Sequence, residues 1–128
     1  SSSTDDTRWQ SDKTIYDPCP AGYRIPDGGE TGFWAITLGT TTSTKVGTQW
    51  DNTNYGHHWT LADGETTAWY PATGYRNNSA ATLYGVRIHS FYWTSSYASP
   101  GMSFNNVSVT PIDSGDKYHA CSVRCVKE

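Results

Sequence analysis

The segment YDPCPAGYRIPDGGE, residues 16–30, places Cys19 between Pro18 and Pro20, and Pro26 follows before an Asp-Gly-Gly-Glu run. Each proline fixes φ and removes a backbone N–H donor, so the segment is neither a helix nor a central strand. We therefore predict a rigid, ordered turn that holds the thiol of Cys19 in a defined direction. The remaining cysteines indicate what that thiol meets.

Cys121 and Cys125 lie four residues apart near the end of the chain. If ACSVRC is a strand, these two share a face at a separation of about 13 Å. A disulfide needs Cα atoms within about 7 Å, so they cannot bond to each other, whereas Cys19 can pair with either. Such a bond closes a loop of roughly a hundred residues and contributes about 4–5 kcal/mol in the chain-entropy model. It indicates an oxidising compartment, which is secreted, periplasmic or at the cell surface. The alternative is three reduced, buried cysteines.

The composition predicts one folded domain with an aromatic core. Among 128 residues, Leu, Ile, Val and Phe together number 17, but there are 6 Trp and 9 Tyr, and the formal charge is −3. Each aromatic buries about 150–250 Å², so a few replace many aliphatic residues. Scattered Lys and Arg predict no nucleic-acid partner, and no apolar run predicts direct membrane insertion. We expect residues 1–13 to be a flexible linker, with a signal peptide removed or lying upstream, and residues 14–128 to be the domain.

A high content of Ser, Thr and Gly favours strands and turns over helices. One helix is predicted over residues 28–38, with Asp27 as N-cap, Glu30 completing a capping box and Gly39 as the stop. The fold class is therefore α+β and loop-rich, with few short antiparallel strands and one or two short helices. Strands are predicted at 14–18, 58–62, 66–70, 91–95, 103–112 and 119–128.

Three local features refine this prediction. Asp63-Gly64 is a hairpin turn between the strands 58–62 and 66–70. The strand 103–112 carries a bulge or an end near Pro111. The long segments 40–58 and 71–85 are predicted to be irregular.

No motif predicts catalysis or metal binding. His57 and His58 are adjacent, so in a strand they point to opposite faces and do not share a metal. The DSGD run at 113–116 is more simply a turn than a calcium loop. The chain has no nucleophile elbow, phosphate loop or dinucleotide fingerprint. We expect no metal and no cofactor.

The stretch YGVRIHSFYWTSSYASPGMSFNN, residues 84–106, combines aromatics with Ser, Gly and Asn. That mixture is typical of binding loops and of sugar-stacking surfaces. The alternative is that these aromatics form the core, and we assign Trp93 to it. The predicted ligand-binding residues are Arg87, His89, Phe91, Tyr97, Asn105, Tyr118 and His119.

Five motifs in order resemble the Fibrobacter succinogenes major paralogous domain, which is abundant in surface proteins of Bacteroides and its relatives. The resemblance covers residues 14–128 and implies a C-type-lectin-like fold with paired N- and C-terminal strands. It also implies that Cys19 pairs with Cys125, which leaves Cys121 as an odd thiol: reactive, intermolecular, or simply a small buried residue. The motifs are DPCPAGYRIP, FWAI, YPATGYRNNSAATLYGV, FYWTSS and CSVRCVKE.

Some members of this domain group are similar to variable proteins of diversity-generating retroelements, which display mutable residues on a lectin-like frame. Their target codons favour Asn, Ser, Tyr, His, Asp and Thr, and residues 77–119 are rich in these types. The chain has RIHSF at 87–91 where the family usually has a glycine-rich step. The calcium-and-sugar tripeptides of animal C-type lectins, Glu-Pro-Asn and Trp-Asn-Asp, are absent.

The predicted function is non-catalytic recognition of a protein or glycan ligand at the bacterial outer surface, by an adhesin or a variable binding protein. One alternative is a structural subunit of a pilus or surface assembly. In that case the domain is part of a larger surface protein or pilus. The other is an enzyme of the formylglycine-generating type, which shares the lectin-like fold and relies on a reactive cysteine pair.

Overall fold

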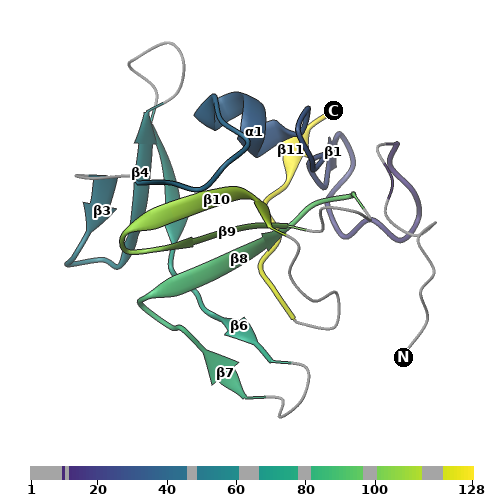
Figure 1. The fold of residues 1–128 in the computed structure, drawn as a ribbon. Helices are drawn as coiled ribbons and strands as arrows, with labels where there is room; N and C mark the ends of the chain where they lie inside the picture. Colours follow the sequence, from purple (N-terminus) through teal and green to yellow (C-terminus); the bar gives the residue numbers. More distant parts are fainter. Residues whose placement is uncertain are drawn as a thin grey trace.

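In the computed structural model, the described residues are Gln10 and the ranges 12–45, 49–60, 67–77, 82–96, 101–113 and 120–128. Within them the chain is a small α+β fold of short antiparallel strands and one short helix, which confirms the predicted class at this level (Figure 1). Most of the predicted linker 1–13 lies outside the described residues. Among the described helices, none has the length and apolarity needed to cross a bilayer.

The elements are β1 (Tyr23–Arg24), α1 (Phe33–Leu38), β2 (Thr44–Lys45), β3 (Trp50–Asp51), β4 (Gly56–Thr60), β5 (Thr67–Pro71), β6 (Tyr75–Arg76), β7 (Leu83–Tyr84), β8 (His89–Trp93), β9 (Gly101–Asn105), β10 (Ser108–Asp113) and β11 (Val126–Lys127). They form a four-stranded sheet of order β2-β10-β9-β8, a three-stranded sheet of order β3-β4-β5, and the pairs β1-β11 and β6-β7.

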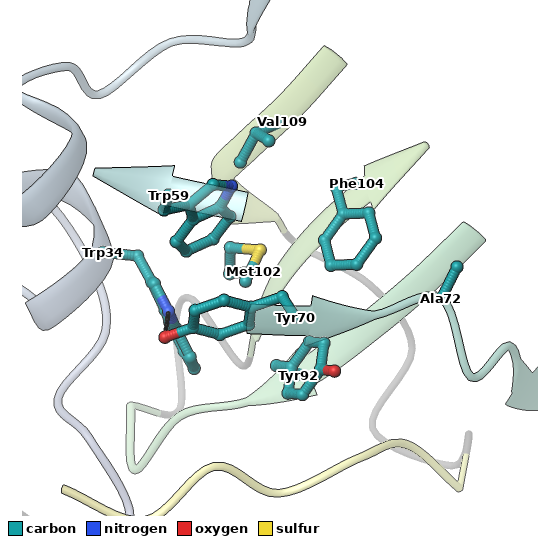
Figure 2. Packing of buried hydrophobic residues seen from close by; sticks show 8 residues of the cluster. All are labelled: Trp34, Trp59, Tyr70, Ala72, Tyr92, Met102, Phe104 and Val109. Atoms are coloured by element: carbon teal, nitrogen blue, oxygen red, sulfur yellow. Dashed lines mark hydrogen bonds between the residues drawn. The ribbon is translucent and has the colours of Figure 1, made fainter. Parts of the chain in front are cut away.

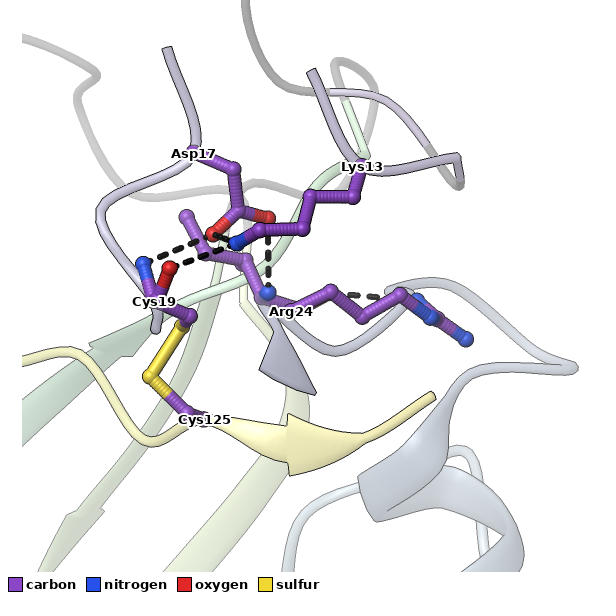
Figure 3. Close-up of a disulfide and its surroundings, with 6 residues drawn as sticks. Lys13, Asp17, Cys19, Arg24 and Cys125 are labelled. Carbon is purple, nitrogen blue, oxygen red and sulfur yellow. Dashed lines mark hydrogen bonds and ion pairs between the residues drawn. A yellow bond between two sulfur atoms is a disulfide. The ribbon is translucent and has the colours of Figure 1, made fainter. Parts of the chain in front are cut away.

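The two ends of the domain are joined twice. β1 pairs antiparallel with β11, with Arg24 opposite Val126. Beside this pair, Cys19 and Cys125 form a disulfide with a Cα–Cα distance of 5.8 Å across 106 positions of sequence (Figure 3). Both features, the paired terminal strands and this cysteine pairing, are those that the family resemblance implies. The proline-flanked turn thus points Cys19 at the last segment of the chain.

The predicted strand over residues 14–18 is wrong, because Asp17 builds a turn there. Its Oδ1 accepts the N–H of Cys19 at 2.8 Å and its Oδ2 accepts the N–H of Ile25 at 3.0 Å. The Nζ of Lys13 lies 3.2 Å from the same carboxylate and donates to the Cys19 carbonyl at 2.6 Å (Figure 3). Burial raises the pKa of Asp17, but these donors outweigh burial and hold that pKa below its ordinary value.

The helix α1 is shorter than the predicted helix 28–38, and the predicted capping box is wrong. The carboxylate of Asp27 binds the guanidinium of Arg24 at 3.1 and 3.2 Å and accepts the hydroxyl of Ser95 at 3.1 Å, and Asp27 is not the N-cap. Gly32 is the N-cap and has no side-chain hydrogen bond. The predicted stop is confirmed, because Gly39 is the C-cap with a φ of 67°.

The single strand predicted over 103–112 is wrong, because it is the hairpin β9-β10. The Oδ1 of Asn105 accepts the N–H groups of Val107 at 2.8 Å and Ser108 at 2.9 Å, and so turns the chain. The predicted irregularity near Pro111 is confirmed, since the β9-β10 register shifts in that part of β10.

The other strand predictions hold in part. The predicted hairpin 58–62 and 66–70 forms β4 and β5, although its turn lies outside the described residues. The strand 91–95 corresponds to β8. Of 119–128, only β11 is a strand, preceded by single bridges from Ala120 and Ser122. The segments predicted to be irregular contain β2, β3, β6 and β7, each only two residues long.

Aromatic rings from α1, β4, β5, β8 and β9 form most of the core (Figure 2). Trp59 stacks on Tyr70 with ring centroids 4.0 Å apart, and the indole of Trp34 donates to the Tyr70 hydroxyl at 3.2 Å. Trp93 is also buried, as predicted. The main cluster consists of Trp34, Trp59, Tyr70, Ala72, Tyr92, Met102, Phe104 and Val109.

The C-terminal segment contacts β5 through Arg124 and so holds this strand against the core. The guanidinium of Arg124, one residue before the disulfide, donates to the Trp69 carbonyl at 2.7 Å. Its central carbon also lies 4.6 Å from the centroid of the Tyr70 ring, which is a cation–π distance. The disulfide therefore holds Arg124 in place as well as the terminal strands.

Replacing both Cys19 and Cys125 by alanine should lower the free energy of unfolding by about 4 kcal/mol, because the long loop is no longer closed in the unfolded chain. Urea unfolding followed by tryptophan fluorescence measures the change. Cys121→Ala is the matched control, and we expect it to cost less than about 1 kcal/mol because this side chain is free and only half-buried. Equal losses in the two variants would contradict the prediction.

Candidate recognition surface

A run of exposed apolar side chains with one arginine begins in β7 and ends just before β8. Leu83 and Ile88 are 55% and 58% exposed, and Tyr84 and Val86 are also largely open to solvent. Single exposed apolar residues are ordinary, whereas several in one short segment make that segment a candidate interaction site. Figure 1 shows β6 and β7 extending away from the main sheet, on the side opposite α1. We name Leu83, Tyr84, Val86, Arg87 and Ile88 the 83–88 patch.

Tight backbone geometry supports the 83–88 patch. Arg87 has a φ of 69°, a left-handed conformation that side chains other than glycine rarely adopt. Its N–H donates to the Ala72 carbonyl at 2.9 Å, and its guanidinium lies 5.3 Å from the centroid of the Tyr55 ring. The N–H groups of Ile88 and His89 both donate to the Gly85 carbonyl, at 2.9 and 2.7 Å. The segment is thus anchored to residues that precede β4 and follow β5.

His89 lies at the base of the 83–88 patch, half-buried at the start of β8. Its ring meets the edge of the Tyr75 ring at 5.3 Å, and Tyr75 in turn stacks on Tyr84 at 6.3 Å. Burial lowers the pKa of His89, and the charge of Asp113 opposes that shift only in part. The His89 ring thus packs against Tyr75 of this aromatic pair.

The structure brings together only part of the predicted ligand-binding set. Arg87 and His89 meet at the 83–88 patch. Phe91 is only 4% exposed, because its ring covers Gly101, where any Cβ would overlap it, so the expectation that Phe91 lies on the surface is wrong. The side chain of Asn105 holds the β9-β10 turn. The remaining three, Tyr97, Tyr118 and His119, lie outside the described residues.

Sequence reasoning missed Tyr55 and Leu83. Tyr55 has a φ of 56° and ends the turn between β3 and β4, where it lies under Arg87. The turn-forming run DNTNYG was a visible signal for that turn. Nothing in the sequence indicated that this turn would pack beside residue 87.

The adjacent histidines point to opposite faces of the sheet, as predicted. His57 is fully buried between the rings of Trp50 and Phe104, at 5.0 and 4.9 Å, whereas His58 is exposed. The Nε2 of His57 lies 2.8 Å from the Asn105 carbonyl; because a carbonyl only accepts, Nε2 carries the proton. Its Nδ1 is buried without a partner among the described residues, and burial lowers the pKa of the ring.

The described residues offer little chemistry. Cys125 is held in the disulfide, and burial together with the charge of Asp113 raises the pKa of the Cys121 thiol to about 12. A thiol with that pKa forms almost no thiolate at neutral pH. Within the described ranges, no three His, Cys, Asp or Glu side chains gather in a way that could hold a metal ion.

No protein-family model, curated protein or solved structure matches this chain.

His57→Gln should reduce the loss of stability in acid. The unfolded state takes up a proton below about pH 6.5, whereas the folded state keeps His57 neutral, so stability falls as the pH drops from 6.5 through the lowered folded pKa. Each such group contributes at most about 1.4 kcal/mol per pH unit. Urea unfolding between pH 7 and 5 should give a shallower slope for the variant; some slope remains because His89 shares the same shift. Parallel slopes would refute the assignment.

Arg87→Val should be less stable than Arg87→Gly by about 1–2 kcal/mol, because a β-branched residue is strained at positive φ and glycine is not. Both variants lose the guanidinium contact with Tyr55, so the difference between their free energies of unfolding measures only the backbone strain at position 87. Thermal or urea unfolding measures it. Equal stability would mean that Arg87 does not hold this conformation in solution.

Proposed function

We propose that this chain is a non-catalytic, extracellular recognition domain that binds a protein or glycan ligand through the 83–88 patch. The observation that carries the proposal is the exposure of three aliphatic residues beside Tyr84 and Arg87 on an anchored segment. Aromatic residues and arginine dominate binding energy in protein interfaces. Membership of the C-type-lectin-like surface domains, as an adhesin or as a variable binding protein, is part of this proposal.

Rigid support of the 83–88 patch favours binding. Ordering a mobile segment on association costs free energy, so a segment that is already ordered binds more tightly for the same contacts. Here the hydrogen bond to Ala72, the Tyr55 contact and the bonds to the Gly85 carbonyl hold the segment before any ligand arrives. The disulfide and the β1-β11 pair stabilise the frame beneath it.

Several features support the lectin-like and extracellular parts of the proposal. The termini are paired, a disulfide joins them, and the described chain has one short helix and many connecting loops. A disulfide of this span is typical of oxidising compartments. The absence of a reactive thiol pair among the described residues disfavours formylglycine-type chemistry, since Cys125 is bonded and the pKa of Cys121 is raised.

The same exposed aliphatic residues also favour a second candidate, a subunit of a surface assembly. Leu83, Val86 and Ile88 could be covered by a neighbouring subunit rather than by a separate ligand. Sedimentation of the purified domain over a range of concentrations distinguishes the two, because an assembly subunit associates with itself and a recognition domain stays monomeric.

The test of the proposal is a screen of the disulfide-bonded domain against protein and glycan arrays, followed by the double variant Leu83→Ser, Ile88→Ser. We expect at least one ligand to bind this domain more strongly than it binds an unrelated control domain. The double variant should bind that ligand at least about tenfold more weakly, because it lacks the contact area of both side chains. Ile36→Ser is the matched control, because Ile36 is 69% exposed on α1. No ligand, or equal affinity in all three proteins, would refute the proposal.

A further inference from the structure

The outward face of the β3-β4-β5 sheet carries a second concave surface, separate from the 83–88 patch. Strand alternation turns His57 and Tyr70 inward and leaves the cross-strand pair His58 and Trp69 outside. Together with the turn after β3, this pair borders an open hollow of roughly 420 Å³, within the range of small-molecule sites. We name this surface the Trp69 hollow. Its lining residues are Asp51, Asn54, His58, Trp69 and Pro71.

Trp69 provides an aromatic wall for the hollow. A Cβ at Gly56 would lie 2.6 Å from the Cη2 of Trp69, so the indole lies over the bare backbone of that glycine. Any side chain at position 56 would displace it. Arg124 anchors the Trp69 backbone through the 2.7 Å bond to its carbonyl. The indole is thus held in place but only half-buried.

A hydrogen-bonded turn fixes the polar side of the hollow. The Oδ1 of Asp51 accepts the N–H groups of Thr53 at 2.8 Å and Asn54 at 2.9 Å. Its Oδ2 contacts the Asn54 side-chain nitrogen at 3.0 Å and the Nε2 of His58 at 3.2 Å. The His58 ring packs against Trp69 with centroids 4.6 Å apart. One carboxylate therefore positions both polar neighbours of the indole.

This arrangement limits the ligand chemistry. The Asp51 carboxylate already has four partners, so it has little capacity left for a cation, and its negative charge disfavours an anion. The Asn54 amide keeps an N–H donor and an Oδ1 that accepts no hydrogen bond within the described part of the chain. The ligand that fits has an uncharged C–H face for the indole and hydroxyl groups at its rim.

We propose that the Trp69 hollow binds one neutral pyranose ring of a glycan, with the sugar C–H face against Trp69 and its hydroxyls on Asn54. This inference rests on the proposed function and names its ligand class. Tyr55 connects the two surfaces, because it follows Asn54 directly and its ring lies under Arg87 of the 83–88 patch. A glycan seated in the hollow is therefore placed to continue towards that patch.

The experiment is a ¹H–¹⁵N titration of the disulfide-bonded domain with the methyl glycosides of glucose, galactose, mannose and N-acetylglucosamine. We expect at least one of them to shift the Trp69 indole N–H resonance, assigned as the one missing in Trp69→Phe. Saturation transfer from the protein to that sugar measures binding in the variants that lack the indole. Trp69→Ala should abolish this transfer, whereas Trp69→Phe should retain part of it because an aromatic face remains. Asn54→Ala should weaken binding about fivefold through its lost hydrogen bond.

Controls keep the outcome interpretable. Tyr23→Ala removes an exposed aromatic ring far from the hollow in sequence, on β1, and should leave binding unchanged. Asn54 is exposed, so Asn54→Ala tests the site even if Trp69→Ala fails to fold. The inference is overturned if no glycoside moves the Trp69 resonance, if binding survives Trp69→Ala, or if choline moves that resonance more strongly than every sugar.

The two proposals fail separately. If array binding depends on Leu83 and Ile88 while no glycoside reaches Trp69, the recognition function stands and the sugar site is rejected. If neither surface responds to its own substitutions, both are rejected. If a glycoside binds through Trp69 but the array ligand ignores the 83–88 patch, the sugar site stands and the patch is rejected.

Discussion

The joining of the chain's two ends at Cys19 and Cys125 is the constraint on which the rest of this structure depends. A domain with so few aliphatic residues has a limited hydrophobic core, and closing a loop of 106 positions lowers the entropy of the unfolded chain by an amount worth about 4–5 kcal/mol. The same closure places Arg124 against β5, where it holds the Trp69 carbonyl and covers the Tyr70 ring. One covalent bond thereby orients the terminal strands and one wall of the core.

Aromatic residues serve both the interior and the surface, and strand alternation decides which. On β5, Tyr70 stacks on Trp59 inside the domain, while its neighbour Trp69 lies outside over Gly56. On β4, His57 is buried and His58 is exposed in the same way. Residues of nearly identical chemistry therefore stabilise the fold at one position and remain available for binding at the next.

The two candidate binding surfaces share a structural link. The turn after β3 presents Asn54 to the Trp69 hollow and Tyr55 to Arg87. Both of its ends are held by backbone bonds, since Tyr55 donates to the Asp51 carbonyl and accepts from the N–H of Ala72, each at 2.9 Å. Because both surfaces are already ordered, a ligand long enough to contact both would gain the second contact without a further ordering cost.

Local chemistry in the sequence predicted a good deal of this protein. The proline-flanked turn around Cys19, the Gly39 helix stop, the β4-β5 hairpin and the opposite faces of His57 and His58 all follow from residues close together in the chain. Two of the wrong predictions failed because another part of the fold occupies the side chain. Asp27 does not cap the helix because Arg24 and Ser95 bind its carboxylate, and Phe91 is buried because it covers Gly101.

The sequence by itself determined the class of fold, its aromatic core and the rigid turn around Cys19, because propensity, composition and proline geometry act over short range or on the whole chain at once. Only the tertiary structure decided which aromatic rings reach the surface and which side chains meet there. Tyr55 lies 32 positions from Arg87 in the sequence, and Asp51 lies 18 positions from Trp69. Such neighbours are set by sheet register and turn geometry, which no pattern local to either residue contains.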